Sequence, residues 1–513
     1  MADRHFVNGG VDNLWGTIGN WSLTEGGAGG QTVPTAAQSV AFDAGSPICT
    51  IDASARVCLT LTTAAYTKTL TFDQQLSVSG SITIGASTGF AGTTTNRLRM
   101  IAAGTWTTNA KTIPQDIEIG GTTTFTCTLA DALTTSGTLY LTNTTSTIFA
   151  GNYHITAANM NISGTQSVTV VHDVTVTGTL TVADAWSSML GAWTWYVGGL
   201  TMTGGITTAT VGAGIVMTGG TWQGSGAMVC NLTIAGDVTV SGAVSFGSTT
   251  RALTYSSGSG TVTTTGSTLT LDGSCVLDTA GISWNNVTIG GGGVTMTNNS
   301  LLTVTGTLTL PDCAYTFAGT AGWTAGTLAH AALAATRIYT FKEGLTYTVT
   351  TAMNVSHTGV QTRRYTYTSA HAATKAILTL AYGATQSVAF LDPTRIDSSL
   401  GQPIFSYAGV ITTSFNWSND LGYGNILPEA GGESVTVAGI TKDNAGTALG
   451  SCDVYLFRDN GNDTPTYIAY QESNSVTGAY SFTVFPGSAY FVVAFKGGAT
   501  PVMDVTDRTV TAV

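Results

Sequence analysis

Residues 70–84 read Leu-Thr-Phe-Asp-Gln-Gln-Leu-Ser-Val-Ser-Gly-Ser-Ile-Thr-Ile, a stretch built from one short repeated pattern. Phrases of the form apolar–Thr/Ser–apolar begin at Leu70, Leu76 and Ile82, six residues apart. This alternation places the apolar side chains on one face of a strand and the hydroxyl side chains on the other. Because strands this short are marginal alone in water, they need neighbours to stack on. The stretch therefore predicts short, repeated and stacked strands.

The same phrase recurs at the same step along the chain. It stands at 174–176 and 180–182, at 232–234, 238–240 and 244–246, and at 302–304 and 308–310. Winding such units into coils stacks each strand on its equivalent in the next coil, with aliphatic ladders inside and Thr/Ser ladders outside. Proline, which removes a ladder N–H, is absent between Pro114 and Pro311. We therefore predict an all-β protein built on a long right-handed parallel β-helix.

The rival architecture is an antiparallel sandwich or a string of immunoglobulin-like modules. It would give a repeat of about 100 residues, with turn-forming residues roughly every 8–12 residues. The six-residue step and the lack of linkers favour the β-helix.

Composition excludes several classes of protein. Charged residues make up 9% of the chain, whereas hydrophobic residues make up 43%, which is too many for a disordered protein. The net charge is −11 and the basic residues do not cluster, so we expect no nucleic-acid binding. No stretch reaches the roughly 18 apolar residues that span a bilayer, so we expect no membrane insertion. The first ten residues also lack the apolar segment of a secretory signal peptide.

Changes in local amino-acid composition along the chain suggest four regions. Residues 1–45 contain Trp15 and Trp21 among turn-forming residues, and we interpret them as a cap or attachment segment that covers the open end of the helix. The β-helix then occupies 46–427, followed by a linker at 428–433. Charged residues become more frequent in 434–513, which we predict to be a small, separate C-terminal β-sandwich.

The sequence contains no recognisable metal or cofactor motif. The seven cysteines are spread thinly, none stands in a C-x-x-C pair, and the six histidines lie far from them, so we expect no metal and no cofactor. Cys49 and Cys58 are the one pair close in sequence. They would be either buried thiols or a disulfide that links adjacent coils, and the sequence leaves both interpretations open.

Candidate catalytic residues are few. Glycoside hydrolysis needs two carboxylates roughly 5–10 Å apart, and alternate residues or adjacent coils could supply them. The candidate pairs are Asp116 with Glu118, Asp272 with Asp278, and Asp392 with Asp397. All stand at strand ends, where Asp commonly forms turns. A nucleophile elbow or a phosphate loop requires a helix after the strand, which this sequence does not predict. We therefore expect a protein that is not an enzyme.

Aromatic residues give a stronger functional signal, since they crowd into one part of the chain. The cluster comprises Trp186, Trp193, Trp195 and Tyr196, with Trp222 a short way on. If their rings are exposed, they form a strip on which the sugars of a host surface glycan would stack. If they are buried, they fill the core or a subunit contact, as large aromatic residues usually do.

Both ends of the predicted helix resemble the Gly/Thr-rich β-helix proteins of tailed bacteriophages, prophages and bacterial surfaces. The matching phrases are Gly19-Asn20-Trp21-Ser22, Val33-Pro34-Thr35-Ala36, Val40-Ala41-Phe42-Asp43, Cys49-Thr50-Ile51-Asp52, Phe341-Lys342-Glu343-Gly344, Ser387-Val388-Ala389-Phe390 and Phe415-Asn416-Trp417. The resemblance implies a structural protein of the virion surface, made in the host cytoplasm and acting as a tail fibre or spike-like appendage for host attachment. Alternatives are a capsid decoration or head-fibre protein, and then a bacterial surface adhesin or a polysaccharide-degrading tailspike.

The C-terminal region resembles the carboxypeptidase-regulatory or transthyretin-like module, which is a β-sandwich. The resemblance rests on Val437-Ala438-Gly439, Asp443-Asn444-Ala445-Gly446 and Thr477-Gly478-Ala479-Tyr480. An Asp commonly precedes the Gly-x-Tyr in this family, but Ser473-Asn474-Ser475-Val476 stands here. In phages, such modules decorate virion proteins as adhesive or stabilising appendages.

Low charge on the outer ladders leads to an expectation about assembly. Uncharged Thr/Ser surfaces have little protection against association, and closed symmetry limits the growth of an assembly. We therefore expect a homo-oligomer, most simply a homotrimer, bound to other virion proteins through the end that carries Trp15 and Trp21. The sandwich would then project outward, although the opposite polarity is also compatible with the sequence.

Overall fold

A computed structural model describes most of the 513-residue chain. It covers residues 3–10, 12–53, 56–121, 124–143, 146–163, 167–183, 186–190, 194–203, 206–208, 214–224, 226–247, 251–256, 260–290, 294–355, 363–369, 374–388, 391–398, 400–401, 404–406, 426–428, 435–443, 445–458, 466–484, 489–497, 502–505 and 510–511. The chain divides into two compact units, Met1–Cys275 and Val276–Val513. The closing part of the predicted helix, 407–425, and most of the predicted linker lie outside these ranges.

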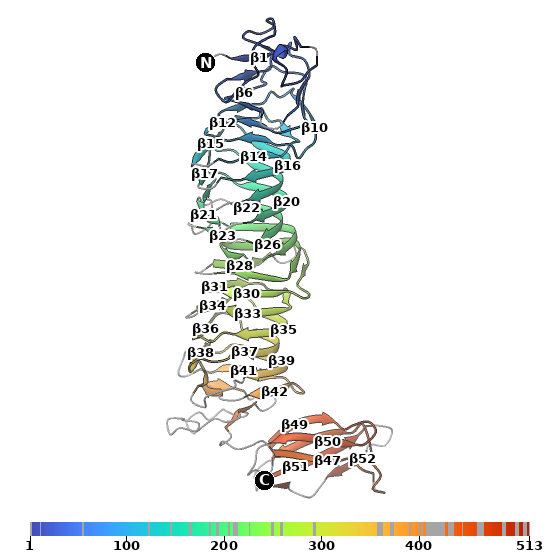
Figure 1. Cartoon of the computed structure of the whole chain (residues 1–513). Coiled ribbons are helices and arrows are strands. Elements are labelled where there is room, and N and C mark those ends of the chain that lie inside the picture. The colour runs from blue at the N-terminus through green and yellow to red at the C-terminus, as the bar shows by residue number, and fades with distance from the viewer. Residues whose placement is uncertain are drawn as a thin grey trace. The chain divides into compact units, whose positions relative to one another are not determined.

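The fold is a parallel β-solenoid of about 14 turns with a small C-terminal sheet region, so the predicted fold class is confirmed (Figure 1). Apart from the 3-10 turn η1 (Ile18–Asn20), every element in the described residues is a strand. Hydrogen bonds between coils join residues about one turn apart, such as Thr135 Oγ1 to the Gln115 carbonyl, 20 positions away, and the Thr138 N–H to Asp116 Oδ1, 22 positions away.

Three sheets form the first unit. The first contains β1 (Arg4–Phe6), β2 (Trp21–Ser22), β3 (Val40–Ala41), β6 (Leu61–Thr62), β9 (Ile82–Thr83), β12 (Gly104–Thr107), β15 (Phe125–Leu129), β17 (Ser146–Ala150), β19 (Ser167–Thr169), β21 (Trp186–Leu190), β23 (Ile206–Thr208), β25 (Ala227–Val229), β27 (Ala243–Phe246) and β30 (Thr268–Asp272). The second contains β5 (Arg56–Cys58), β8 (Leu76–Val78), β11 (Leu98–Met100), β13 (Thr112–Ile113), β14 (Ile117–Ile119), β16 (Leu133–Leu141), β18 (Ile155–Ile162), β20 (Val174–Val182), β22 (Thr194–Met202), β24 (Gly214–Gln223), β26 (Asn231–Ser241), β28 (Arg251–Tyr255) and β29 (Val262–Thr263). The third contains, among the described residues, β4 (Cys49–Ile51), β7 (Thr69–Phe72) and β10 (Gly89–Gly92).

The six-residue step of the sequence has two structural meanings. In the stretch 70–84 it separates β7, β8 and β9, which belong to three different sheets, so each phrase forms one side of a coil. Further along, the two phrases of 174–182 merge into the single strand β20, and those of 232–240 merge into β26. The β20 ladder shifts register between Val176 and Thr179, which marks a bend within a continuous strand. The expectation that each phrase is a separate strand is therefore wrong in this region.

Inward-facing residues form continuous apolar ladders through the coils of the first unit. Each member lies opposite the next in a parallel pair, and each is buried. One ladder runs Leu76, Leu98, Ile117, Leu139, Met160, Leu180, Leu200, Trp222 and Val240. Another runs Leu133, Ile155, Val174, Trp195, Ile215, Leu232 and Leu253. Burial of these side chains supplies the main stabilisation of each coil on its neighbours.

An aromatic cluster fills the N-terminal end of the first unit. Trp15 and Trp21 pack edge to face with ring centroids 4.8 Å apart, and Phe6 and Phe42 both contact Trp21. The Trp21 Nε1–H donates to the Trp15 carbonyl at 2.7 Å. β1 pairs in parallel with β3 and antiparallel with β2, so the chain folds back at this end. The segment covers apolar side chains that an open coil would expose.

In the second unit, two parallel sheets form the solenoid part. One contains β32 (Ser283–Trp284), β33 (Asn286–Gly290), β35 (Leu302–Leu310), β37 (Trp323–His330), β39 (Thr346–Val355), β41 (Ala376–Leu380), β42 (Thr385–Val388) and β44 (Ile396–Asp397). The other contains β34 (Val294–Asn298), β36 (Tyr315–Gly319), β38 (Arg337–Phe341), β40 (Tyr365–Ser369) and β43 (Leu391–Thr394). The strand β31 (Cys275–Asp278) begins in the first unit and ends in the second. A separate parallel pair joins β45 (Ile404–Ser406) to β46 (Ile426–Pro428). Aromatic residues such as Phe341 and Tyr367 fill these coils.

The C-terminal part of the second unit has its own core between two antiparallel sheets. One sheet pairs β47 (Val435–Ile440) with β50 (Ala479–Val484). The other has the order β49 (Thr466–Glu472), β48 (Asp453–Arg458), β51 (Ala489–Lys496) and β52 (Val502–Val505), with β53 (Val510–Thr511) also on β51. Side chains from both sheets meet in one cluster: Val437, Cys452, Val454, Leu456, Phe482, Tyr490 and Val492. We call this part the sandwich.

Candidate functional site

Of the two interpretations of the aromatic cluster on the solenoid, burial in the core is the one that holds for Trp195 and Trp222. Trp195 and Trp222 each occupy a position in an inward ladder and are only 1% exposed, so they cannot stack on a ligand. They are core residues because strand alternation points them inward. Tyr196 follows Trp195 on β22, faces outward and is 37% exposed. The side chain of Trp186 and the whole of Trp193 lie outside the described residues.

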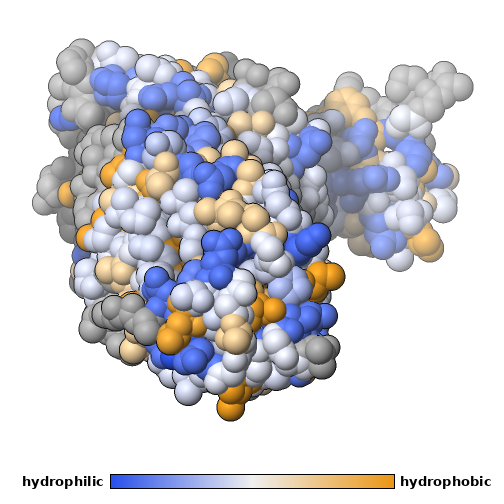
Figure 2. Space-filling view, turned by 90° about the horizontal axis from the view of Figure 1, so that it is seen from above, coloured by the Kyte–Doolittle hydropathy of each residue, from blue (hydrophilic) through white to orange (hydrophobic). Residues whose placement is uncertain are grey.

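Trp15 and Trp21 cannot themselves contact a partner, since both are fully buried in the aromatic cluster. The prediction that they mark an attachment end therefore has to rest on other side chains of the same region. Ile18, Leu23 and Ile48 are the large apolar residues exposed there, each by about half of its surface. Figure 2 looks onto this end and shows hydrophobic residues as separate groups among hydrophilic ones.

Cys49 and Cys58 are free, buried thiols, so the structure contains no disulfide between them. Cys49 lies on β4 in the third sheet, and Cys58 lies on β5 in the second. Burial raises the pKa of both thiols well above the usual value. Of the two interpretations that the sequence left open, the buried thiols are therefore the one that the structure adopts.

Two of the candidate carboxylate pairs include side chains with partners between coils. Asp116 Oδ1 accepts from the Thr138 N–H at 2.7 Å, and Glu118 forms ion pairs with Arg97 and Arg99, each at 2.7 Å. Burial alone would raise the pKa of Glu118, but the hydrogen bonds from the two arginines hold it below its usual value. Asp272 accepts from the Ser245 hydroxyl. These contacts assign Asp116, Glu118 and Asp272 to the stability of the coils.

Asp392 differs from these acids because burial raises its pKa to about 6, against the opposing effects of Arg364 and Thr366. It lies on β43, whereas its candidate partner Asp397 lies on β44 in the other sheet of the second unit. Within the described ranges, no group of three or more His, Cys, Asp or Glu side chains is placed to hold a metal ion. In that same part of the chain, no helix has the length and apolar character needed to cross a membrane.

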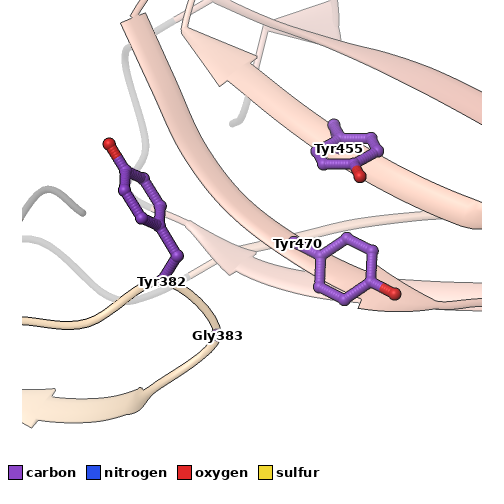
Figure 3. Close-up of a pocket in the computed structure, with 4 residues that line it drawn as sticks. All are labelled: Tyr382, Gly383, Tyr455 and Tyr470. Carbon is purple, nitrogen blue, oxygen red and sulfur yellow. The ribbon is translucent and has the colours of Figure 1, made fainter. Parts of the chain in front are cut away.

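A hollow of about 450 Å³ lies in the second unit and is lined by tyrosines (Figure 3). Tyr382 and Gly383 come from the turn between β41 and β42, where Gly383 has a positive φ of 85° that suits glycine. Tyr455 from β48 and Tyr470 from β49 form the opposite side. Tyr382 is 70% exposed.

Strand alternation explains why tyrosines face this hollow. Val454 and Leu456 on β48 point into the core of the sandwich, so Tyr455 between them points outward. Tyr455 lies directly opposite Tyr470 on β49, and Asp453 lies opposite both Glu472 on β49 and Phe495 on β51. We use the name aromatic face for Tyr455, Phe457, Tyr470, Phe491 and Phe495, which all lie on this outer side of the larger sheet.

The aromatic face contains two groups of rings. Phe457 and Phe491 stack with centroids 5.2 Å apart and an interplanar angle of 11°. Tyr455 contacts Tyr470 at 5.1 Å and 45°, and Phe495 at 5.7 Å and 78°. Tyr470 and Phe495 are 40% and 37% exposed, which is unusual for side chains of this size. The second group is therefore an open corner of rings.

A hydrogen bond links this corner to a carboxylate. The Tyr470 hydroxyl donates to Asp453 Oδ1 at 2.7 Å. That bond and the nearby charges of Asp453 and Glu472 raise the pKa of Tyr470 to about 12, so the phenol keeps its proton at neutral pH. The corner thus combines aromatic faces with negative charge.

Comparison with protein-family models, with curated proteins and with solved structures finds no match for this chain. The candidate site therefore rests on its own geometry. The sequence does not single out this corner, because its aromatic residues are densest around Trp195. The signal was present in the alternation of Val454-Tyr455-Leu456-Phe457, which places two aromatic residues on one face of a strand whose other face is aliphatic.

Proposed function

We propose that this chain is a structural protein of a bacteriophage virion surface, a tail fibre or spike-like appendage for host attachment. The observation that carries the proposal is the combination of about 14 stacked parallel turns with a separate sandwich that exposes an aromatic face. The first is a repetitive support that can lengthen coil by coil, and the second is a surface suited to recognition.

The outer surface of the solenoid supports a mechanical role. One outward ladder of the second sheet runs through Thr134, Thr156, Thr175, Tyr196, Val216, Thr233 and Thr254 without a charged residue. Acids such as Asp116 and Glu118 hold neighbouring coils together. The phage assignment within this structural class follows the resemblance of both ends of the helix to Gly/Thr-rich phage proteins.

Immunogold labelling of intact particles tests the proposal. Antibody raised against residues 434–513 is applied to virions of the phage or prophage that encodes the chain, and antibody adsorbed on the same fragment is the control. Label at the tips of fibres or spikes is the expected result. Label scattered over the head would instead identify a decoration or head-fibre protein, and unlabelled particles would refute the virion assignment.

A further inference from the structure

We propose that the corner formed by Tyr455, Tyr470 and Phe495 binds an alkylammonium group, with Asp453 and Glu472 as its counter-charges. This inference deepens the proposed attachment function by naming the chemical class that the sandwich recognises. It rests on that function only for the idea that a host surface carries the ammonium group.

The angles between the rings favour a cation over a sugar ring. A pyranose stacks best on a flat aromatic platform, whereas a compact ammonium group needs ring faces that converge on it from several directions. Tyr455 makes angles of 45° with Tyr470 and 78° with Phe495, so the three rings do not form a flat platform. The electron-rich face of an aromatic ring attracts a cation placed within about 6 Å of its centroid.

Charge complementarity points to the same ligand. Asp453 and Glu472 face each other across β48 and β49 at the rim of the corner. Because the Tyr470 hydroxyl donates to Asp453 at 2.7 Å, electron density shifts toward the phenol ring, which strengthens its attraction for a cation. A neutral ligand can use the two carboxylates only as hydrogen-bond acceptors, whereas a cation also gains from their charge.

The nearest lysine of the same strand does not fill the corner. Lys496 follows Phe495 on β51, so its side chain points to the other side of the sheet. There its Nζ donates to the carbonyls of Gly450 and Ser451 at 2.5 and 3.0 Å. The adjoining hollow of about 450 Å³ gives room for a group as large as trimethylammonium.

The test titrates the purified full-length protein with tetramethylammonium chloride and follows the ligand methyl signal by saturation-transfer NMR. tert-Butanol is the neutral probe of similar size, and methyl β-galactoside is the sugar probe. We expect saturable binding of tetramethylammonium with a dissociation constant on the order of millimolar. Neither neutral probe should compete at equal concentration. Equal binding of tert-butanol would refute the proposal and show that the corner is a general apolar patch. Preferential binding of the sugar would also refute it and would indicate a glycan site.

Variants separate charge and aromaticity from folding. Tyr470→Leu and Phe495→Leu keep an apolar side chain, and each should weaken binding by about threefold to tenfold. Glu472→Gln should weaken it and make it less sensitive to salt. Phe457→Leu, which changes the aromatic face outside the corner, is the matched control and should bind as the wild type does. Unchanged binding in both Tyr470→Leu and Phe495→Leu would refute the proposal.

Tyr470→Phe is the control for misfolding of the Tyr470→Leu variant, because it keeps the ring and removes only the hydroxyl. It should retain most of the binding, and thermal unfolding by circular dichroism shows whether each variant is folded. Failure of these titrations would leave the particle-labelling result untouched, so the two proposals fail separately.

Discussion

Gly198 shows at the scale of one residue how closely the coils approach. A Cβ at this position would lie 2.2 Å from the Thr177 carbonyl oxygen of the neighbouring coil, which is far below van der Waals contact. We predict that Gly198→Ala destabilises the protein by about 1–3 kcal/mol, since the ladder has to open locally. The shift of the urea or thermal midpoint measures this. Gly45→Ala is the control, because a Cβ there meets nothing within 4 Å, and an equal loss in both variants would contradict the argument.

Asp392 gives a second residue-scale prediction, on pH. Burial raises its folded-state pKa to about 6 from the ordinary 3.8. The folded state therefore holds this proton more tightly than the unfolded state, and its contribution to stability is lost as pH rises through roughly 4 to 6. We predict that Asp392→Asn leaves stability unchanged near pH 3.5 and increases it by about 1 kcal/mol at pH 7, after discounting for the partial exposure of the side chain.

The pH series contains its own control, since the wild type and the variant are compared by thermal midpoint at each pH. A constant difference between them from pH 3.5 to 7 would show that the effect comes from packing and not from ionisation of Asp392.

Single residues also show where inference from the sequence stops. The density of aromatic residues around Trp195 was visible, but whether a ring faces inward depends on strand register. In Thr194-Trp195-Tyr196-Val197, successive side chains face opposite sides of the strand. The composition alone is compatible with Trp195 inside and Tyr196 outside, or with the reverse. Only pairing with Val174 and Ile215 shows that Trp195 is inside and Tyr196 outside.

Among the elements of the second unit, the strands of the sandwich share a core of their own. Its cluster of buried residues draws on β47, β48, β50 and β51, all after position 434. We predict that residues 434–513 expressed alone unfold cooperatively, as a single transition in urea followed by circular dichroism and fluorescence. The matched control is the same fragment with Val454→Asp, which places an unpaired charge in the core and should abolish the transition. A wild-type fragment without a transition would mean that the sandwich depends on the rest of the chain.

Element boundaries were predictable where alternation is strong. Apolar alternation predicts strands at 435–440, 454–457, 480–484 and 490–495, and the structure has β47, β48, β50 and β51 there within two residues. β49 lacks such a signal, because its segment, Thr-Tyr-Ile-Ala-Tyr-Gln-Glu, does not alternate regularly between polar and apolar residues. That missed strand carries Tyr470, and the candidate site was missed with it.

At the scale of the whole molecule, the parallel solenoid could be predicted from a period because each coil needs only its neighbours. The merging of two phrases into one strand, as in β20 or β26, could not be predicted from the sequence. The six-residue step is the same whether the chain turns from one sheet to another or bends within one strand. What differs is whether the third sheet, formed by β4, β7 and β10, is present at that level of the solenoid. This distinction depends on contacts between coils and not on the phrase itself.

Assembly is the last property that belongs to the whole molecule. The outward ladder through Thr175, Tyr196 and Thr233 carries no charge, and closely spaced uncharged ladders give little protection against association. We predict a closed homotrimer, and sedimentation equilibrium at micromolar concentration should give three times the 52.5 kDa chain mass. The double variant Tyr196→Lys, Thr233→Lys places positive charges on the ladder, so it should dissociate to monomers with an unchanged circular dichroism spectrum. Thr71→Lys adds charge to the third sheet instead and should remain trimeric. A wild-type protein that sediments as a monomer would refute the prediction, and a double variant that stays trimeric would show that the contact uses another face of the solenoid.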